Sequence, residues 1–248
     1  MSPRRSAFFD VGTNTILCVI AEIRDTGRFR VLDDMGEITR LGQGVDQTRR
    51  ISAEGEERSL AVLKRYRGRC DHLGVDEIVA VGTSALRDAE NSGEVCARFR
   101  EELGFDIRVI SGAEEAAYSF LAVQRGLALT ERQILVIDIG GGSTEFVSGN
   151  PCANCHAASI DLGSVRLTER FLHSDPVQPD EVTRMNAAID QELDCLPERG
   201  IIPSPPFALV GIAGTFTTLV AMEKNLARYS HRDMHGSMLT LDAVKRQL

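Results

Sequence analysis

Two stretches of the chain place an aspartate, glycines and small hydroxyl residues between apolar runs. The first reads AFFDVGTNTILCVI at residues 7–20, and the second reads ILVIDIGGGSTEF at residues 134–146. A turn rich in glycine exposes consecutive backbone N–H groups, which converge on an anion and above all on a phosphate. An aspartate just before such a turn would repel that anion, but it can hold a metal ion or water that bridges to the phosphate. The two stretches therefore predict phosphate and metal handling at two related turns.

An ordinary β-hairpin is the alternative interpretation of each turn taken alone. Neither stretch has the spacing of a P-loop or of a Rossmann fingerprint. The recurrence of the same turn in both halves of the chain favours phosphate binding. A third segment, LVGIAGTFTTL at 209–219, brings Gly214 and Thr215 to a strand-to-helix junction, where the helix N-terminus also favours an anion.

The elements that must position these turns alternate between strand and helix. Each turn lies between two apolar runs, as antiparallel pairing permits. Helical patterns follow at 53–73 and at 181–196, and the second of these has one apolar face. The alternation predicts an α/β fold with mixed sheets in two similar halves, with a boundary near a helix at 112–127.

Composition and charge restrict the class of protein. The chain has 248 residues, 43% of them hydrophobic, and a net charge of −8. The acidic balance argues against general binding to nucleic acid or to anionic membranes. Asp10 interrupts the first apolar run after three residues, which argues against a signal peptide, and no run reaches the roughly 18 residues that span a bilayer. These features, with cysteines scattered through apolar patterns, predict a cytoplasmic protein.

The stretch PCANCHA contains Cys152, Cys155 and His156 in the spacing of a c-type haem attachment site. Haem attachment takes place outside the cytoplasm. We therefore expect an inert turn here, with a zinc site or a redox pair as the alternatives.

Six segments resemble, in order and spacing, motifs of the exopolyphosphatase/guanosine pentaphosphate phosphohydrolase (Ppx/GppA) family, which belongs to the actin, sugar-kinase and 70-kDa chaperone superfamily. They run from about residue 7 to residue 226 and read DVGTNT, VGTSALRDAEN, ISGAEEA, VIDIGGGSTE, IDLGSVRLTE and GIAGTFTTL. The resemblance implies two related ribonuclease-H-like domains, 1–124 and 125–248, with mixed sheets flanking a cleft. Family members continue for several dozen residues further, so we expect the second domain to be C-terminally incomplete. Apolar surface left exposed in this way would favour association, for instance as a homodimer.

The resemblance also implies roles for single residues. It places Glu115 as the general base that activates the attacking water, Arg87 as an arginine facing the cleft, and Glu145 as a ligand of that water or of the metal. Mg²⁺ (or Mn²⁺) is expected on Asp138 and Glu145. The residues expected to bind phosphate are Asp10, Gly12, Thr13 and Asn14 in the first loop, Gly140, Gly141, Gly142, Ser143 and Thr144 in the second, and Gly214 and Thr215 in the third.

Without the resemblance, Glu115 would be interpreted as an acid at a solvated helix start, where it interacts favourably with the helix dipole, and Arg87 as a surface cation. With it, the expected activity is removal of the terminal phosphate from inorganic polyphosphate or from pppGpp. A phosphotransferase of the same superfamily is one alternative. Another is a catalytically weak regulator that binds polyphosphate or guanosine penta- or tetraphosphate. Arg40, Arg49 and Arg50, in the segment ITRLGQGVDQTRR at 38–50, are candidate contacts for such a polyanion, and a solvated loop is the alternative interpretation.

Overall fold

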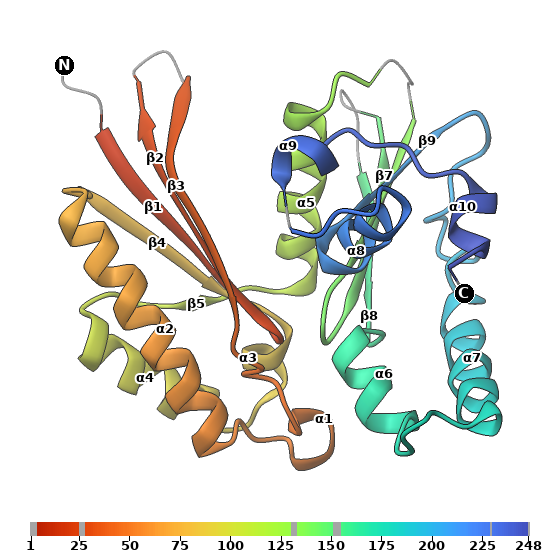
Figure 1. Ribbon diagram of the computed structural model, residues 1–248, viewed down its shortest axis with the longest axis horizontal. Helices are drawn as coiled ribbons and strands as arrows, with labels where there is room; N and C mark the ends of the chain where they lie inside the picture. The colour runs from red at the N-terminus through yellow and green to blue at the C-terminus, as the bar shows by residue number, and fades with distance from the viewer. Residues whose placement is uncertain (1–3, 25–27, 130–132, 151–154, 229, 248) are drawn as a thin grey trace. The chain divides into compact units, whose positions relative to one another are not determined.

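The computed structural model describes residues 4–24, 28–129, 133–150, 155–228 and 230–247 (Figure 1). It confirms the predicted α/β fold with two mixed sheets. By contacts the chain forms two compact units. One contains the residues up to Gly112 together with Val165–Asp175, and the other contains Ala113–Ser164 and the residues from Pro176 onward. The domain boundary at residue 124 stays a prediction. The helix Gly112–Gly126, which contains residue 124, packs with the second unit.

The first unit is built on a five-stranded sheet in the order β3-β2-β1-β4-β5. β1, β2 and β3 are antiparallel neighbours, and β4 runs parallel to β1. The strands are β1 Arg4–Val11, β2 Thr15–Ile23, β3 Phe29–Ile38, β4 Glu77–Gly82 and β5 Arg108–Val109. The helices of this unit are α1 Val45–Thr48, α2 Ala53–His72, α3 Ser84–Asp88, α4 Ser92–Leu103 and α6 Ser164–Phe171, the last of which joins it from Val165 onward.

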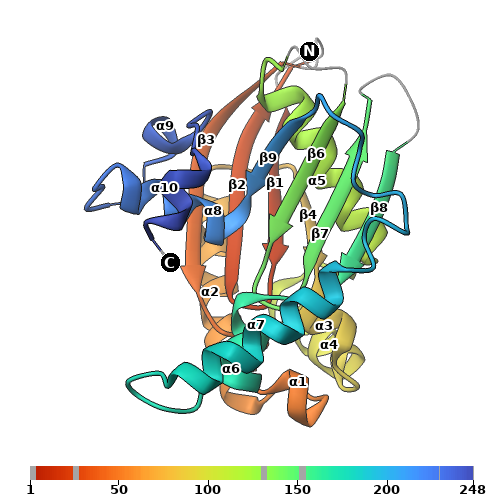
Figure 2. The ribbon, with the colours of Figure 1, turned by 90° about the vertical axis from the view of Figure 1, so that its right-hand side faces the viewer.

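The second unit repeats the order of the first four of these strands, without a counterpart of β5. Its sheet has the order β8-β7-β6-β9, with β7 antiparallel and β9 parallel to the central strand β6 (Figure 2). The strands are β6 Ile134–Ile139, β7 Thr144–Gly149, β8 Cys155–Ile160 and β9 Ala208–Ile212. The helices are α5 Gly112–Gly126, α7 Pro179–Leu193, α8 Ala213–Glu223, α9 His231–Met234 and α10 Leu241–Lys245.

Helix α2 shows how the sequence pattern produces the core of the first unit. Ser52 caps it by accepting a hydrogen bond from Gly55 N, as Ser favours at this position. Leu60, Leu63 and Cys70 follow at helical spacing and are buried in one apolar cluster with the inner face of β1.

The helix predicted at 181–196 is present as α7, but its apolar face is only partly covered. Val182 is 38% exposed, whereas Glu181 is buried because it completes a capping box with Gln178 at the helix start. Of the haem-like pattern, Cys155 is exposed at the start of β8, and Cys152 lies outside the described residues. Over the described ranges, no helix is both long enough and apolar enough to cross a membrane.

Candidate functional site

The two glycine turns have the same local structure. Each joins an antiparallel strand pair through four residues, and the N–H of the first donates to the carbonyl of the last. Gly12 N donates to the Thr15 oxygen at 3.1 Å, and Gly140 N donates to the Ser143 oxygen at 3.0 Å. The chain therefore folds the same hairpin twice. In each sheet the hairpin lies at the end of the strands from which β4 or β9 leads into a helix.

The two hairpins differ in the residue that lies opposite the aspartate. Asp10 pairs with Leu17 on β2, whereas Asp138 pairs with Glu145 on β7. Directly opposed residues on antiparallel strands share one face of the sheet, with Cβ atoms about 4.5–5.5 Å apart, and like charges there repel. Only the second hairpin therefore presents two opposed carboxylates, an arrangement that a cation would stabilise.

Glu145 is the most enclosed member of this pair, with 1% of its surface exposed. Burial raises the pKa of its carboxyl to about 7, and the negative charges of Glu115 and Asp138 act in the same direction. Hydrogen bonds from Ser159 and Ser143 oppose this rise, and the Ser159 hydroxyl donates to Glu145 Oε1 at 2.7 Å. The site therefore holds a carboxylate at an energetic cost, as functional carboxylates often are held.

Asp138 receives its partner from helix α5. The Ser119 hydroxyl donates to Asp138 Oδ2 at 2.7 Å, and burial raises the pKa of the Asp138 carboxyl. Ser119 follows Glu115 by four positions, so both side chains lie on the same face of α5. The buried residues Ala116 and Phe120 fix this helix against β6. Helix α5 thus supplies a hydroxyl donor to Asp138 and places the charge of Glu115 near Glu145.

The segment after β8 supports the second glycine turn from behind. The Thr144 hydroxyl donates to the Leu162 carbonyl at 2.6 Å, and Ser164 N donates to the Gly140 carbonyl at 3.0 Å. A Cβ added to Gly163 would lie 2.4 Å from the Gly141 oxygen, so only glycine fits between these hydrogen bonds. The IDLGS sequence therefore acts as a brace for the turn.

Replacing Gly163 by alanine should destabilise the protein by about 1–3 kcal/mol, because the turn must move away from the added methyl group. Chemical denaturation measures this change. Gly93→Ala is the matched control, since a Cβ at Gly93 meets nothing within 4 Å in helix α4. This control should be neutral or stabilising by about 0.5–1 kcal/mol. Equal effects of the two substitutions would show that the turn does not depend on the brace.

The third phosphate candidate lies at the start of α8. The Thr215 hydroxyl donates to the Ile139 carbonyl at 3.4 Å, which places this helix start beside the end of β6 and the second glycine turn. Ala213 has φ of 70°, a left-handed conformation that costs a non-glycine residue energy and that clusters at functional sites. Gly214 and Thr215 thus lie near the second turn.

The structure distributes the other candidates between its units. Asp10, Gly12, Thr13, Asn14 and Arg87 belong to the first unit, and Glu115, Asp138, Glu145, Gly140–Thr144, Gly214 and Thr215 belong to the second. Arg87, near the end of α3, donates to the Ile110 carbonyl at 3.1 Å.

The sequence analysis did not identify two residues of the second hairpin site, Ser119 and Ser159. Ser119 could have been predicted to lie on the same helix face as Glu115, because it follows Glu115 by one helical turn. Ser159 carries none, because its contact with Glu145 depends on the pairing of β7 with β8.

A pair of opposed carboxylates is a donor set that suits a magnesium ion. In the described parts of the chain, no three His, Cys, Asp or Glu side chains are grouped closely enough to hold a metal. Mg²⁺ is usually bound by one or two carboxylates, with water and substrate phosphates completing its octahedron. Asp138 and Glu145 supply that number of ligands.

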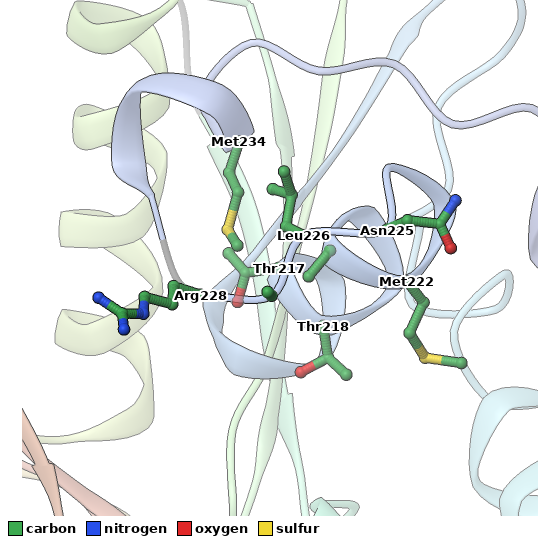
Figure 3. Close-up of a pocket in the computed structure, with 9 residues that line it drawn as sticks. Thr217, Thr218, Met222, Asn225, Leu226, Arg228 and Met234 are labelled. Atoms are coloured by element: carbon green, nitrogen blue, oxygen red, sulfur yellow. The ribbon is translucent and has the colours of Figure 1, made fainter.

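A separate pocket of about 570 Å³ lies along α8 (Figure 3). The hydroxyls of Thr217 and Thr218 both donate to the Gly214 carbonyl, so these donors are already used within the helix. The lining residues are Thr217, Thr218, Ala221, Met222, Asn225, Leu226, Ala227, Arg228 and Met234.

The model of the Ppx/GppA phosphatase family matches residues 19–243. Exopolyphosphatase 2 of Mycobacterium tuberculosis is 35% identical over 96% of this chain and 76% of its own length. A bifunctional 3-dehydroquinate synthase/phosphatase of Fusobacterium nucleatum is 34% identical over 98% of this chain, which spans 38% of that longer protein.

Solved structures agree with these matches. The crystal structure of an exopolyphosphatase from Cytophaga hutchinsonii superimposes with a TM-score of 0.89 at 32% identity, covering 98% of this chain and 78% of that one. The Aquifex aeolicus member of the Ppx/GppA family gives a TM-score of 0.77 at 35% identity, covering 98% and 77%. A PilM–PilN pilus biogenesis complex matches at a TM-score of 0.56 with 12% identity, which shows a shared fold alone.

Proposed function

The chain belongs to the Ppx/GppA phosphatase family, and from this premise we propose that it hydrolyses the terminal phosphoanhydride of inorganic polyphosphate. The observation that carries the proposal is the second hairpin, where Asp138 and Glu145 oppose each other beside a glycine turn. The negative charge of Glu115 acts on Glu145 there and raises its pKa. The naming of the relatives as exopolyphosphatases supports polyphosphate as the substrate. The nucleotide pppGpp ends in the same kind of bond and is the second candidate.

Hydrolysis of a phosphoanhydride requires a positioned water, neutralised phosphoryl oxygens and in-line geometry. In the proposed mechanism, the N–H groups of Gly141–Ser143 bind the oxygens of the terminal phosphoryl group, because the Gly140 N–H is used within the turn. Glu115 orients the water and accepts its proton as the water oxygen bonds to phosphorus, while the bond to the bridging oxygen breaks and the shortened chain leaves.

Asp138 and Glu145 would hold Mg²⁺ (or Mn²⁺), which when bound supplies positive charge for the phosphoryl oxygens. In the first unit, the turn at Gly12–Asn14 and the Arg87 guanidinium are the proposed contacts for phosphate oxygens.

Phosphate release from polyphosphate and from pppGpp, each with and without Mg²⁺, tests the proposal. We expect Mg²⁺-dependent release of phosphate from polyphosphate. Release from pppGpp but not from polyphosphate would show that pppGpp is the substrate instead. Transfer of the phosphate to an acceptor in place of release would favour a phosphotransferase. Measurable binding of either polyanion without release would favour the regulator.

A further inference from the structure

The first glycine turn is braced in the same way as the second, by the segment that follows the third strand of its sheet. Thr39 N and Arg40 N both donate to the Asn14 carbonyl, at 2.9 and 3.0 Å, and Gly42 N donates to the Thr13 carbonyl at 2.9 Å. A Cβ on Gly42 would lie 2.4 Å from Thr13 Cγ2, so a larger residue at this position would force the Thr13 side chain to shift.

The two braces correspond residue by residue but differ in charge. Arg-Leu-Gly at 40–42 stands against the first turn, and Asp-Leu-Gly at 161–163 stands against the second. The leucines are buried in both segments, whereas Arg40 and Asp161 are both exposed. The chain therefore repeats one brace and places a cation beside the first turn at the position where the second has a carboxylate.

The backbone of Arg40 is held in a conformation that arginine does not favour. Its φ is 52°, in the left-handed region where a Cβ is strained. Its N–H is tied to Asn14, and its carbonyl accepts from Gln43 N at 3.1 Å and from Arg58 Nη2 at 3.2 Å. Arg58 also donates from Nε to the Thr39 carbonyl at 2.8 Å. Local strain of this kind is typically retained where a side chain has a task.

The positive charge of this brace is not neutralised within the described residues. No described carboxylate lies within ion-pair distance of the guanidinium of Arg40 or Arg58, and Arg58 is occupied by neutral acceptors. Other arginines of the same unit are paired, such as Arg65 with Glu37 and Arg69 with Asp33. In a chain with a net charge of −8, two guanidinium groups without a carboxylate partner beside a glycine turn favour an anion there.

We propose that Arg40 is a phosphate-binding residue of the first turn, which contacts an oxygen of the phosphate chain next to the group held by the N–H groups of Thr13 and Asn14. Arg58 is a positioning residue, because it holds the carbonyls of Thr39 and Arg40. The inference rests on the proposed function for its ligand, a phosphoanhydride polyanion, but concerns binding alone.

Calorimetric titration of the full chain with tripolyphosphate in EDTA tests the inference without turnover. Arg40→Gln should weaken the affinity by about 10-fold or more, the size expected for one hydrogen bond to a charged group. The slope of log affinity against log salt should also become shallower by roughly 0.7–1, because one fewer phosphate charge is neutralised. Arg40→Lys should keep the slope and part of the affinity.

Arg28→Gln is the matched control. Arg28 is an exposed arginine of the same unit that directly precedes β3, whereas the first turn meets β3 at its other end, at Ile38. The Arg28→Gln variant should bind as the wild type does. Arg40→Gly separates the loss of charge from a folding defect. Glycine relieves the left-handed strain, so this variant should fold well and yet show the same weakened affinity as Arg40→Gln.

Equal affinities for the wild type and Arg40→Gln, or equal losses in Arg40→Gln and Arg28→Gln, would overturn the inference, as would failure of the wild type to bind. Arg40-dependent binding without phosphate release in the hydrolysis assay would support the inference while contradicting the proposed function. Phosphate release by the wild type, together with an affinity that does not change in Arg40→Gln, would support the proposed function and contradict the inference.

Discussion

Replacing Glu115 by glutamine should lower the turnover number for phosphate release by about 10²-fold or more, the lower end of what a general base contributes. Glutamine keeps the shape of the side chain but cannot accept the proton of the attacking water. The fold should survive, because Glu115 is only partly buried and its charge opposes ionisation of Glu145. Steady-state phosphate release with saturating polyphosphate and Mg²⁺ measures the effect.

Glu114→Gln is the control for this substitution. Glu114 is the neighbouring acid in the first turn of α5, so its removal alters the charge and helix dipole interaction similarly. It should leave turnover near the wild-type value. A Glu115→Gln enzyme with near wild-type turnover, or an equal loss in both variants, would remove Glu115 from the role of base.

Replacing Glu145 by glutamine should make the protein more stable at alkaline pH while removing its response to Mg²⁺. The carboxyl has a pKa of about 7 in the folded protein against 4.5 for an ordinary glutamate. Below pH 4.5 the carboxyl is protonated in both states and carries no penalty. As the pH rises toward 7, the unfolded state loses the proton first, so wild-type stability falls. Above pH 7 the accumulated penalty reaches about 3 kcal/mol.

Glutamine cannot ionise, so the Glu145→Gln variant should exceed the wild type in free energy of unfolding by up to about 3 kcal/mol at pH 8.5 in EDTA, and by nothing at pH 4. Glu198→Gln, at an exposed position, should follow the wild type at both values. Mg²⁺ should stabilise the wild type at pH 8.5 but not Glu145→Gln. Parallel stability curves for the wild type and Glu145→Gln would contradict this assignment of a strained carboxylate.

The parts of the site that depend on local sequence were predictable. The apolar runs around Asp10 and Asp138 indicated both strand pairs, and the glycines between them indicated the turns. Alternation of period two also allows Asp138 and Glu145 to share a face once the turn length is known. Helix α2 was predictable from its cap and from the spacing of Leu60 and Leu63.

Contacts between distant segments were not predictable. Ser159 reaches Glu145 only through the register of a neighbouring strand. Helix α6 joins the first unit through Arg166, which pairs with Asp46 and Asp88 at 2.5 Å each. A helical pattern indicates that one face of the helix is covered but not which unit covers it. The order of elements along the chain therefore suggested two consecutive domains, without a helix that returns to the first. The value of the Glu145 pKa likewise depends on burial and on Glu115, which no local pattern encodes.

The central claim is that this chain uses water, activated at Glu115, to cleave a terminal phosphoanhydride. Hydrolysis of polyphosphate in oxygen-18 water with Mg²⁺, followed by mass spectrometry of the released phosphate, tests it most directly. Attack of water on the terminal phosphorus predicts a single solvent oxygen in the released phosphate, with the signal lost in EDTA and in Glu115→Gln. Released phosphate without solvent oxygen, or label incorporation that persists in Glu115→Gln at the wild-type rate, would contradict the claim.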